Sequence, residues 1–294
     1  MKMLILGGTG MLGHKLYQTV KDPIDAWVTV RSNPQSLAKF SFFCPDRVIG
    51  GIEATDMASV RKAIEQVHPD VVVNCIGIVK QQPLGNDPFA CLTINSLLPH
   101  QLAKLCAEYN ARLIHVSTDC VFDGKKGSYK ETDLTNADDL YGRSKALGET
   151  SATNAITIRT SIIGRELNSE FGLVDWFLTQ RDGSAKGFTH ALFSGLTTQE
   201  LSRVIQDVAL NHKDLSGIHQ VSTAPIDKFT LINLLNDAFK TGVTITPCDE
   251  LKIDRTLDST NFRNRTGYEP TTWPEMIREI ASDSTPYHLW RTHK

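Results

Sequence analysis

The sequence predicts an α/β fold built on a doubly wound parallel sheet, with a small mixed C-terminal substrate domain. Three observations predict this fold. A glycine-rich turn joins an apolar strand to a helix at the N-terminus, short apolar strands then alternate with helical segments, and the alternation loosens beyond Gly164. The 294 residues suffice for one large domain with a smaller one attached.

The glycine-rich turn lies within residues 3–13, MLILGGTGMLG. Its apolar residues predict a buried strand, and Gly7, Gly10 and Gly13 lead into helical spacing. Such a turn directs unpaired N–H groups and the positive end of a helix dipole at one point, which suits a phosphate. Gly7 would permit the tight turn, and Gly10 would let the backbone approach an anion. Gly13 would let the helix pack close to the strand. We therefore expect a dinucleotide site; an ordinary strand–helix turn is the alternative.

The second predicted strand, residues 26–30, bears on the choice of cofactor. An acidic residue at its end would bind the ribose 2′-hydroxyl of NAD, whereas an arginine suits the 2′-phosphate of NADP. Arg31 follows this strand, and no Asp or Glu occurs between Val28 and Phe43. The sequence thus favours NADP(H) and still allows NAD(H); for Arg31 a solvated loop charge is the alternative.

Apolar and helical segments alternate along the rest of the N-terminal half. We expect helices at 57–67, 92–109 and 141–150, and strands at 71–76, 112–117 and 155–163. Together with a later segment at about 195–222, residues 1–163 are expected to form the dinucleotide-binding domain.

The substrate-binding region is expected from residues 164–194 and 223–294. The pattern predicts helices at 173–180, 198–212 and 229–240, strands at 217–222 and 243–247, and a helix-rich tail at 261–294. We expect residues 188–198 to form a loop over the substrate, ending in a helix N-cap at Thr197 or Thr198.

Tyr141 and Lys145 lie four residues apart and would share one face of a helix. A phenol titrates near pH ~10, and an adjacent ammonium is expected to lower its pKa, so that Tyr141 can donate a proton to a ketone oxygen. Lys145 could also hold the nicotinamide ribose. Tyr17 and Lys21 have the same spacing, and we interpret them as surface or packing residues because only Tyr141 follows a strand that ends in hydroxyl residues.

Those hydroxyl residues stand at the end of the strand at 112–117. The carboxyl ends of parallel strands face the nucleotide crevice of such folds. Thr118 is therefore expected to bind the substrate carbonyl and orient it toward Tyr141, and Ser117 is the alternative.

Three motifs carry a family resemblance: GGTGMLG at 7–13, STDCVFDG at 117–124 and YGRSK at 141–145. Together they resemble the extended short-chain dehydrogenase/reductase superfamily, which has a Rossmann-like fold. STDxVFDG followed by YGxSKxxGE resembles the dTDP-4-dehydrorhamnose reductase family of nucleotide-sugar reductases, over residues 1 to about 222. The resemblance implies NAD(P)H-dependent reduction of a 4-keto-6-deoxy sugar on a nucleoside diphosphate, with Thr118, Tyr141 and Lys145 as the catalytic trio. The cofactor-binding residues expected from the motifs and the resemblance are Gly7, Thr9, Gly10, Met11, Leu12, Gly13, Arg31, Ile52, Asn74, Cys75, Ile76, Gly77, Asn95, Ser117, Tyr141 and Lys145.

The sequence departs from the family pattern in two places. Cys120 replaces a common aromatic residue, and Gly50-Gly51-Ile52 stands where many members carry Asp near the adenine. A 4-keto-6-deoxy-N-acetylhexosamine on UDP is therefore an alternative to a dTDP sugar as substrate.

Five further residues are candidates for the substrate side. Arg165 could pair with a diphosphate or with a surface carboxylate, as could Arg159, and Trp176 could stack on the sugar or pack in the core. His190 is interpreted as structural. The substrate-side candidates are Lys80, Asp119, Cys120, Arg165 and Trp176.

Composition and missing motifs limit the function. The net charge of −2 gives no reason to expect a nucleic-acid partner, and no apolar run is long enough to span a membrane. Six cysteines without metal-ligand spacing suggest free thiols in a reducing cytoplasm and no metal site. Hydrolase, metalloprotease and P-loop motifs are missing from the sequence. The main hypothesis is a nucleotide-sugar reductase, with a homodimer as its possible assembly. The alternatives are a non-catalytic NADP-binding subunit and a nucleotide-sugar epimerase or dehydratase. A dehydratase usually needs an extra acid/base pair beside the hydroxyl residues; Asp119 supplies one carboxylate, but Cys120 does not supply a second.

Overall fold

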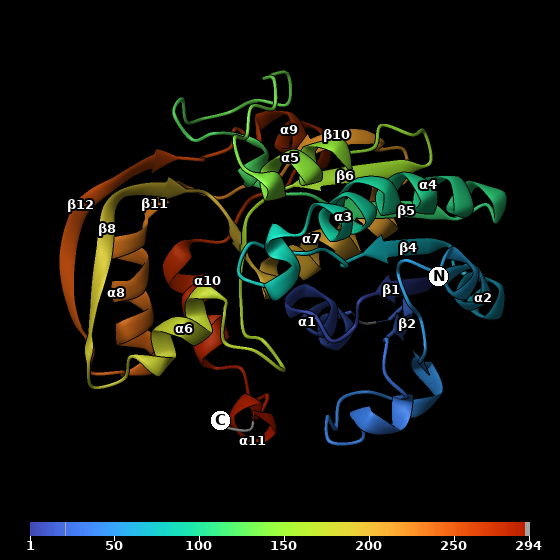
Figure 1. Cartoon of the computed structure of the whole chain (residues 1–294), viewed down its shortest axis with the longest axis horizontal. Helices are drawn as coiled ribbons and strands as arrows, with labels where there is room; N and C mark the ends of the chain where they lie inside the picture. The colour runs from blue at the N-terminus through green and yellow to red at the C-terminus, as the bar shows by residue number, and fades with distance from the viewer. Residues whose placement is uncertain (21, 292–294) are drawn as a thin grey trace.

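The computed structural model describes residues 1–20 and 22–291 and contains a seven-stranded parallel sheet (Figure 1). Its strand order is β10-β6-β5-β4-β1-β2-β3, so the chain winds outward in both directions from β1. The strands are β1 Lys2–Leu6, β2 Asp25–Thr29, β3 Val48–Ile49, β4 Val71–Asn74, β5 Arg112–Val116, β6 Ala155–Arg159 and β10 Gly217–Gln220. The doubly wound fold is thus confirmed. Lys21 of the Tyr17–Lys21 pair and the last three residues of the tail lie outside the described residues.

Both faces of this sheet are covered by helices. In β1, Met3 and Ile5 belong to one apolar core, whereas Leu4 and Leu6 belong to another on the opposite face. The first core includes side chains of α1 Met11–Thr19 and α7 Thr198–Asn211; the second includes those of α2 Met57–Val67 and α4 Leu98–Glu108. A continuous apolar run therefore forms strands buried on two sides.

Short helices complete the nucleotide side of the molecule. They are α3 Pro88–Cys91, a π-helix at Leu92–Leu97, α5 Leu140–Leu147, and 3₁₀ turns at Pro34–Leu37, Pro45–Arg47, Pro83–Asn86 and Asp119–Val121. The predicted helix at 92–109 is present, and its first turns are π-helical. The two-residue strand β3 was not predicted.

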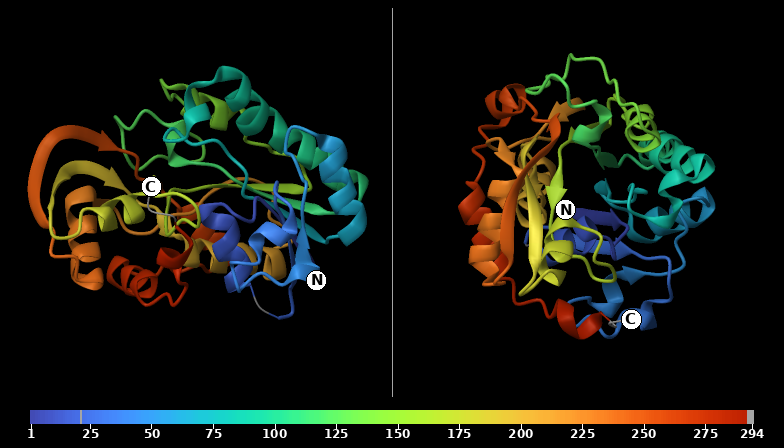
Figure 2. Two further views of the ribbon diagram at one scale, coloured as in Figure 1. Left: turned by 60° about the horizontal axis from the view of Figure 1, so that its bottom comes forward. Right: turned by 60° about the vertical axis from the view of Figure 1, so that its left-hand side comes forward.

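The region predicted to bind the substrate, called the substrate region below, forms a separate mixed sheet at the carboxyl edge of the main sheet (Figures 1 and 2). Its strands β8 Ser184–Phe193 and β12 Thr244–Asp254 are parallel to each other, and β11 Ile226–Asp227 is antiparallel to β8. The helix α8 Lys228–Phe239 packs on this sheet. The other elements are β7 Ile162–Ile163 and β9 Leu196–Thr197, which pair with each other, and α6 Leu173–Thr179, α9 Thr260–Thr266, α10 Trp273–Ala281 and α11 Tyr287–Trp290.

Two predictions about this region were wrong. Residues 188–193 belong to strand β8 and not to a loop over the substrate, because they hydrogen-bond to β12, more than fifty residues later in the chain. The strand expected at 155–163 divides at Arg159: β6 ends there, and Ile162–Ile163 leaves the main sheet to pair with β9. The N-cap of α7 is Thr197, whose hydroxyl accepts a hydrogen bond from the N–H of Glu200. None of the described helices is long and apolar enough to cross a membrane.

Candidate active site

A cavity of about 490 Å³ lies between the carboxyl edge of the main sheet and the substrate region. Its walls come from the start of α1 (Gly10 to Leu12), the loop after β4 (residues 74–82), the end of β5 (residues 116–120) and α5 through Tyr141 and Lys145. Glu166, Phe171, Lys228 and Arg255 line it from the substrate region. This is the edge at which open α/β sheets bind ligands.

The glycine turn has the geometry that a dinucleotide phosphate needs. Gly7 has φ +85°, a conformation that glycine adopts readily, and a Cβ added to Gly13 would lie 2.2 Å from the carbonyl oxygen of Gly7. Gly10 is the N-cap of α1, and no side chain caps this helix. The first N–H groups of α1 are thus left for an anion beside the cavity. These residues fit the diphosphate of NAD(P).

The three predicted catalytic residues line this one cavity. Asp139 caps α5 by accepting a hydrogen bond from the N–H of Gly142 at 2.8 Å, and a Cβ on Gly142 would lie 2.2 Å from the carbonyl oxygen of Cys120. Close packing of α5 on the end of β5 therefore brings Tyr141 beside Thr118. The Lys145 ammonium donates to the carbonyl of Val116 at 2.8 Å.

The pKa of Tyr141 differs from the sequence-based prediction. Burial raises this pKa, and so do the nearby Cys120 and Asp119, while the nearby Thr118 hydroxyl opposes the rise. Lys145 itself is buried, and burial lowers the pKa of its ammonium to about 8, with Glu149 acting in the opposite sense. The expected lowering of the phenol pKa by Lys145 is therefore wrong for the protein without ligands, because desolvation dominates.

Thr118 and Ser117 have different partners, which separates the two alternatives for the carbonyl ligand. The Thr118 hydroxyl accepts from the N–H of Cys120 and donates to Asp119, each at 3.1 Å, beside the phenol. Ser117 donates to Glu149 at 2.8 Å, and Glu149 forms a buried ion pair with Arg159. Ser117 and Arg159 thus share a structural ion-pair network, and the geometry favours Thr118.

Some of the expected cofactor residues line the cavity, and the others do not. Asn95 is buried and fixes the loop after β4, since its side chain bonds the N–H and the carbonyl of Ile78 and the hydroxyl of Ser144. Arg31 is exposed after β2, and Ile52 is buried beside it, with its N–H on the carbonyl of Val30. Cavity-lining members of the predicted set are Gly10, Met11, Leu12, Asn74, Cys75, Ile76, Gly77, Ser117, Tyr141 and Lys145; Gly7, Thr9, Gly13, Arg31, Ile52 and Asn95 do not line it.

Three of the substrate-side candidates line the cavity: Lys80, Asp119 and Cys120. The Lys80 ammonium lies 2.5 Å from Asp139 and 5.8 Å from the centre of the Tyr141 ring. Arg165 instead pairs with the buried Asp175 at 2.6 Å, and Trp176 lies largely exposed on α6 outside the cavity wall. The structure therefore does not bring Arg165 and Trp176 into the site.

Lys228 and Arg255 line the cavity, and sequence reasoning missed them. Lys228 is the first residue of α8, and Arg255 directly follows β12. Neither stands in a motif, so only the pairing of β12 with β8 reveals their position. Within the described ranges, groups of three His, Cys, Asp or Glu residues suited to a metal ion are not found.

The curated proteins that this chain resembles include nucleotide-sugar reductases and a subunit of a transferase. Among curated proteins, methionine adenosyltransferase 2 subunit beta from Xenopus laevis is 30% identical over 148 residues, covering 50% of this chain and 41% of that protein. The dTDP-4-dehydrorhamnose reductase from Aggregatibacter actinomycetemcomitans is 28% identical over 96% of this chain and 98% of its own. The matches to the first relatives span only 33% to 41% of those proteins' lengths.

Solved structures share the fold. A dTDP-4-dehydrorhamnose reductase from Bacillus anthracis, solved in complex with NADP, superposes with a TM-score of 0.76 at 18% identity, over 95% of this chain and 98% of that one. The family model of the RmlD substrate binding domain matches residues 1–285. The chain therefore belongs to the RmlD substrate binding domain family.

Proposed function

We propose that this protein catalyses the NAD(P)H-dependent reduction of the keto group of a nucleoside-diphosphate 4-keto-6-deoxy sugar. The observation that carries the proposal is the convergence of Thr118, Tyr141 and Lys145 on one cavity that also contains the uncapped start of α1. Reductases of dTDP-4-dehydrorhamnose and dTDP-4-keto-6-deoxy-D-glucose are among its relatives, and one structural neighbour binds NADP. NADP(H) is the proposed cofactor, with NAD(H) accepted less well.

The residues of the cavity have separate roles in this proposal. When bound, NAD(P)H supplies the hydride for the reduction. When the sugar binds, the Thr118 hydroxyl turns its proton from Asp119 to the carbonyl oxygen of the sugar, to which Tyr141 also donates a hydrogen bond. The raised pKa keeps Tyr141 protonated until this oxygen becomes basic and takes its proton. The Lys145 ammonium then stabilises the phenolate. Arg255, whose Nε donates to the carbonyl of Phe122 at 2.9 Å, is the cation that we assign to the substrate diphosphate.

The reaction is tested by mixing purified protein with NADPH and a nucleotide keto-sugar and following the nicotinamide absorbance. We expect stoichiometric loss of NADPH with a dTDP- or UDP-linked 4-keto-6-deoxy sugar. Tight binding of NADPH without oxidation in the presence of all such sugars would instead support a non-catalytic subunit, the alternative raised by the similarity to a methionine adenosyltransferase subunit.

The proposal includes a homodimer. Exposed apolar side chains occur on neighbouring helices of the nucleotide side: Phe89 is 86% exposed on α3, Leu97 56% in the π-helix, and Leu147 61% on α5. Association of two copies over this face would remove apolar surface from water. Sedimentation equilibrium should give twice the chain mass, and Phe89→Glu with Leu147→Glu should shift it to the monomer.

A further inference from the structure

Lys228 presents an unusual ammonium to the sugar end of the cavity. The ammonium lies 3.6 Å from the centre of the Phe193 ring, and with the described residues it makes neither a hydrogen bond nor an ion pair. Burial lowers its pKa to about 8, while Asp119 and Cys120 favour the charged form. Lys228 is half-buried and its ammonium faces the cavity, so a ligand oxygen there could accept a hydrogen bond from it.

Asp119 lines the same cavity and complements this cation in charge. Its carboxylate is 4% exposed and follows Thr118, from whose hydroxyl it accepts a hydrogen bond at 3.1 Å. Burial raises the pKa of Asp119, and the cations of Arg255 and Lys228 oppose that rise. Within the described part of the chain, neither cation forms an ion pair with Asp119. The cavity therefore presents a carboxylate acceptor and an ammonium donor that are near each other and not in contact.

A ligand group that satisfies both must offer a donor to the carboxylate and an acceptor to the ammonium, and a donor and an acceptor on different atoms suit two groups that are not in contact. Asp119 would repel a carboxylate on the ligand, and Lys228 would repel an ammonium on the ligand. A hydroxyl offers both functions on one atom, whereas a secondary amide offers an N–H to the carboxylate and a carbonyl oxygen to the ammonium. Cys120, a small side chain, lines the same cavity.

We propose that Asp119 and Lys228 form a recognition site for an acetamido substituent on the sugar of the substrate. The inference rests on the proposed function, because Thr118 would hold the sugar ketone directly beside Asp119. It makes the protein selective for a nucleotide-linked N-acetylated keto-sugar over its hydroxyl counterpart, and Lys228 is then a residue that determines specificity.

The test uses stable ligands that need no turnover. Calorimetric titration of the full chain, saturated with NADPH, compares UDP-N-acetylglucosamine with UDP-glucose. We expect about tenfold tighter binding of the acetamido sugar, which corresponds to ~1.4 kcal/mol. Lys228→Met should reduce that preference to less than about threefold, whereas Lys186→Met, at an exposed lysine of β8, should preserve it.

Equal affinity of the wild type for the two sugars, or binding of neither, would overturn the inference. Equal weakening of both sugars by Lys228→Met would overturn it too, since that result indicates a contact with the shared nucleotide diphosphate. The outcome is separate from that of the proposed function. If the protein reduces keto-sugars but binds both UDP sugars equally, only the acetamido site is contradicted. If it prefers the acetamido sugar but reduces no keto-sugar, only the reductase function is contradicted.

Discussion

At the scale of single residues, burial determines the protonation states in the cavity. Tyr141 enters the proposed reaction as a neutral phenol, because its pKa is raised. A raised pKa suits a group that must give its proton only when a stronger base forms on the substrate. The role that the sequence suggested for Lys145, lowering this pKa in the resting protein, thus becomes a role after proton transfer.

Replacing Tyr141 with Phe removes the proton donor and keeps the ring. We expect kcat to fall by about 10²- to 10⁴-fold, the usual contribution of a general acid, with little change in NADPH affinity. Stopped-flow turnover and fluorescence titration of NADPH measure the two quantities. Unchanged turnover in this variant would remove the phenol from the mechanism.

The ammonium of Lys145 should make cofactor affinity depend on pH. Burial lowers its pKa to about 8, so the charge is present below that pH and is lost above it. We expect NADPH binding to weaken as pH rises from 7 to 9, with a midpoint near 8. Lys145→Met should bind weakly at every pH, and Lys228→Met should retain the wild-type dependence. A pH-independent wild type would show that Lys145 does not contact the cofactor.

At the scale of elements, a buried ion pair fixes α5 to the main sheet. Arg159 at the end of β6 donates twice to Glu149, which follows α5, at 2.7 Å each. Glu149 also accepts from Ser117. Since Lys145 lies one turn before Glu149, this pair positions the catalytic helix against the end of β5.

Removal of one partner leaves the other buried and uncompensated. Glu149→Ala should lower the free energy of unfolding by about 3–5 kcal/mol, measured by urea denaturation. The double variant Glu149→Gln with Arg159→Met should recover part of that loss, because no buried charge remains. A loss below about 1 kcal/mol in Glu149→Ala would mean that water reaches the pair.

Local periodicity predicted the elements whose apolar contacts repeat along the chain. The helix Met57–Val67 was predicted at its observed bounds, and the strands at 71–76 and 112–117 within two residues of theirs. β8 was missed because its partner β12 is distant in sequence and its Gly and Thr residues resemble a loop. The site follows the same division: Thr118 and Tyr141 stand in short motifs, whereas Lys228 reaches the cavity only through the tertiary fold.

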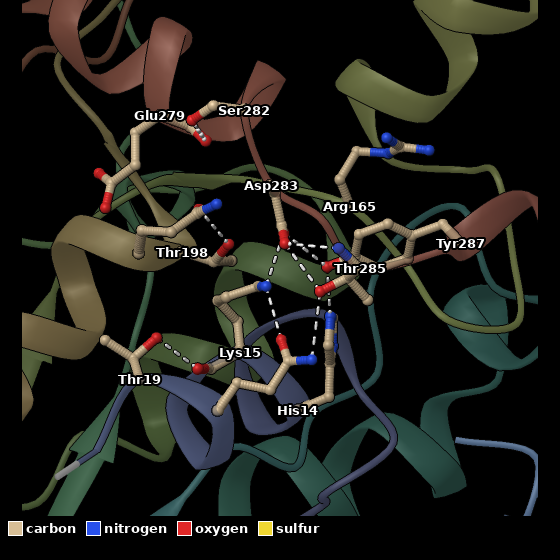
Figure 3. Close-up of polar contacts among 12 residues, drawn as sticks. His14, Lys15, Thr19, Arg165, Thr198, Glu279, Ser282, Asp283, Thr285 and Tyr287 are labelled. Atoms are coloured by element: carbon tan, nitrogen blue, oxygen red, sulfur yellow. Dashed lines mark hydrogen bonds and ion pairs between the residues drawn. The ribbon is translucent and has the colours of Figure 1, made fainter. Parts of the chain in front are cut away.

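At the scale of the whole molecule, the C-terminal segment joins the nucleotide helix α1 to the substrate region. Figure 3 shows Lys15 of α1 against Asp283, at 2.6 Å, and His14 against the phenol of Tyr287, at 3.0 Å. Arg291 then contacts Asp175 of α6 and the carbonyl of Glu166, a residue of the cavity wall. The relative position of the two regions around the cavity therefore depends on this segment.

His14 makes that junction sensitive to acid. Its Nδ1 lies 2.7 Å from the carbonyl oxygen of Gly10, an acceptor, so Nδ1 carries the proton and Nε2 can only accept a hydrogen bond. The Tyr287 hydroxyl lies 3.0 Å from Nε2 and 3.2 Å from a carboxylate oxygen of Asp283, so these two acceptors share its one proton. Burial lowers the pKa of His14 from 6.5 to about 4. Between these values the unfolded chain binds a proton that the folded protein does not, so stability falls as pH decreases from 6.5 toward 4.

The size of this effect follows from the two pKa values. His14 should contribute about 2 kcal/mol to the loss of unfolding free energy between pH 7 and pH 5. Urea denaturation at both pH values measures the loss of unfolding free energy. We expect this loss to be smaller by that amount in His14→Gln than in the wild type. His190→Gln, at an exposed histidine of β8, should lose as much as the wild type. His115, also buried with a lowered pKa, adds its own loss to all three proteins and cancels in the comparison. An equal loss in His14→Gln and wild type would mean that His14 is protonated in the folded protein, and that its contact with Tyr287 survives the charge.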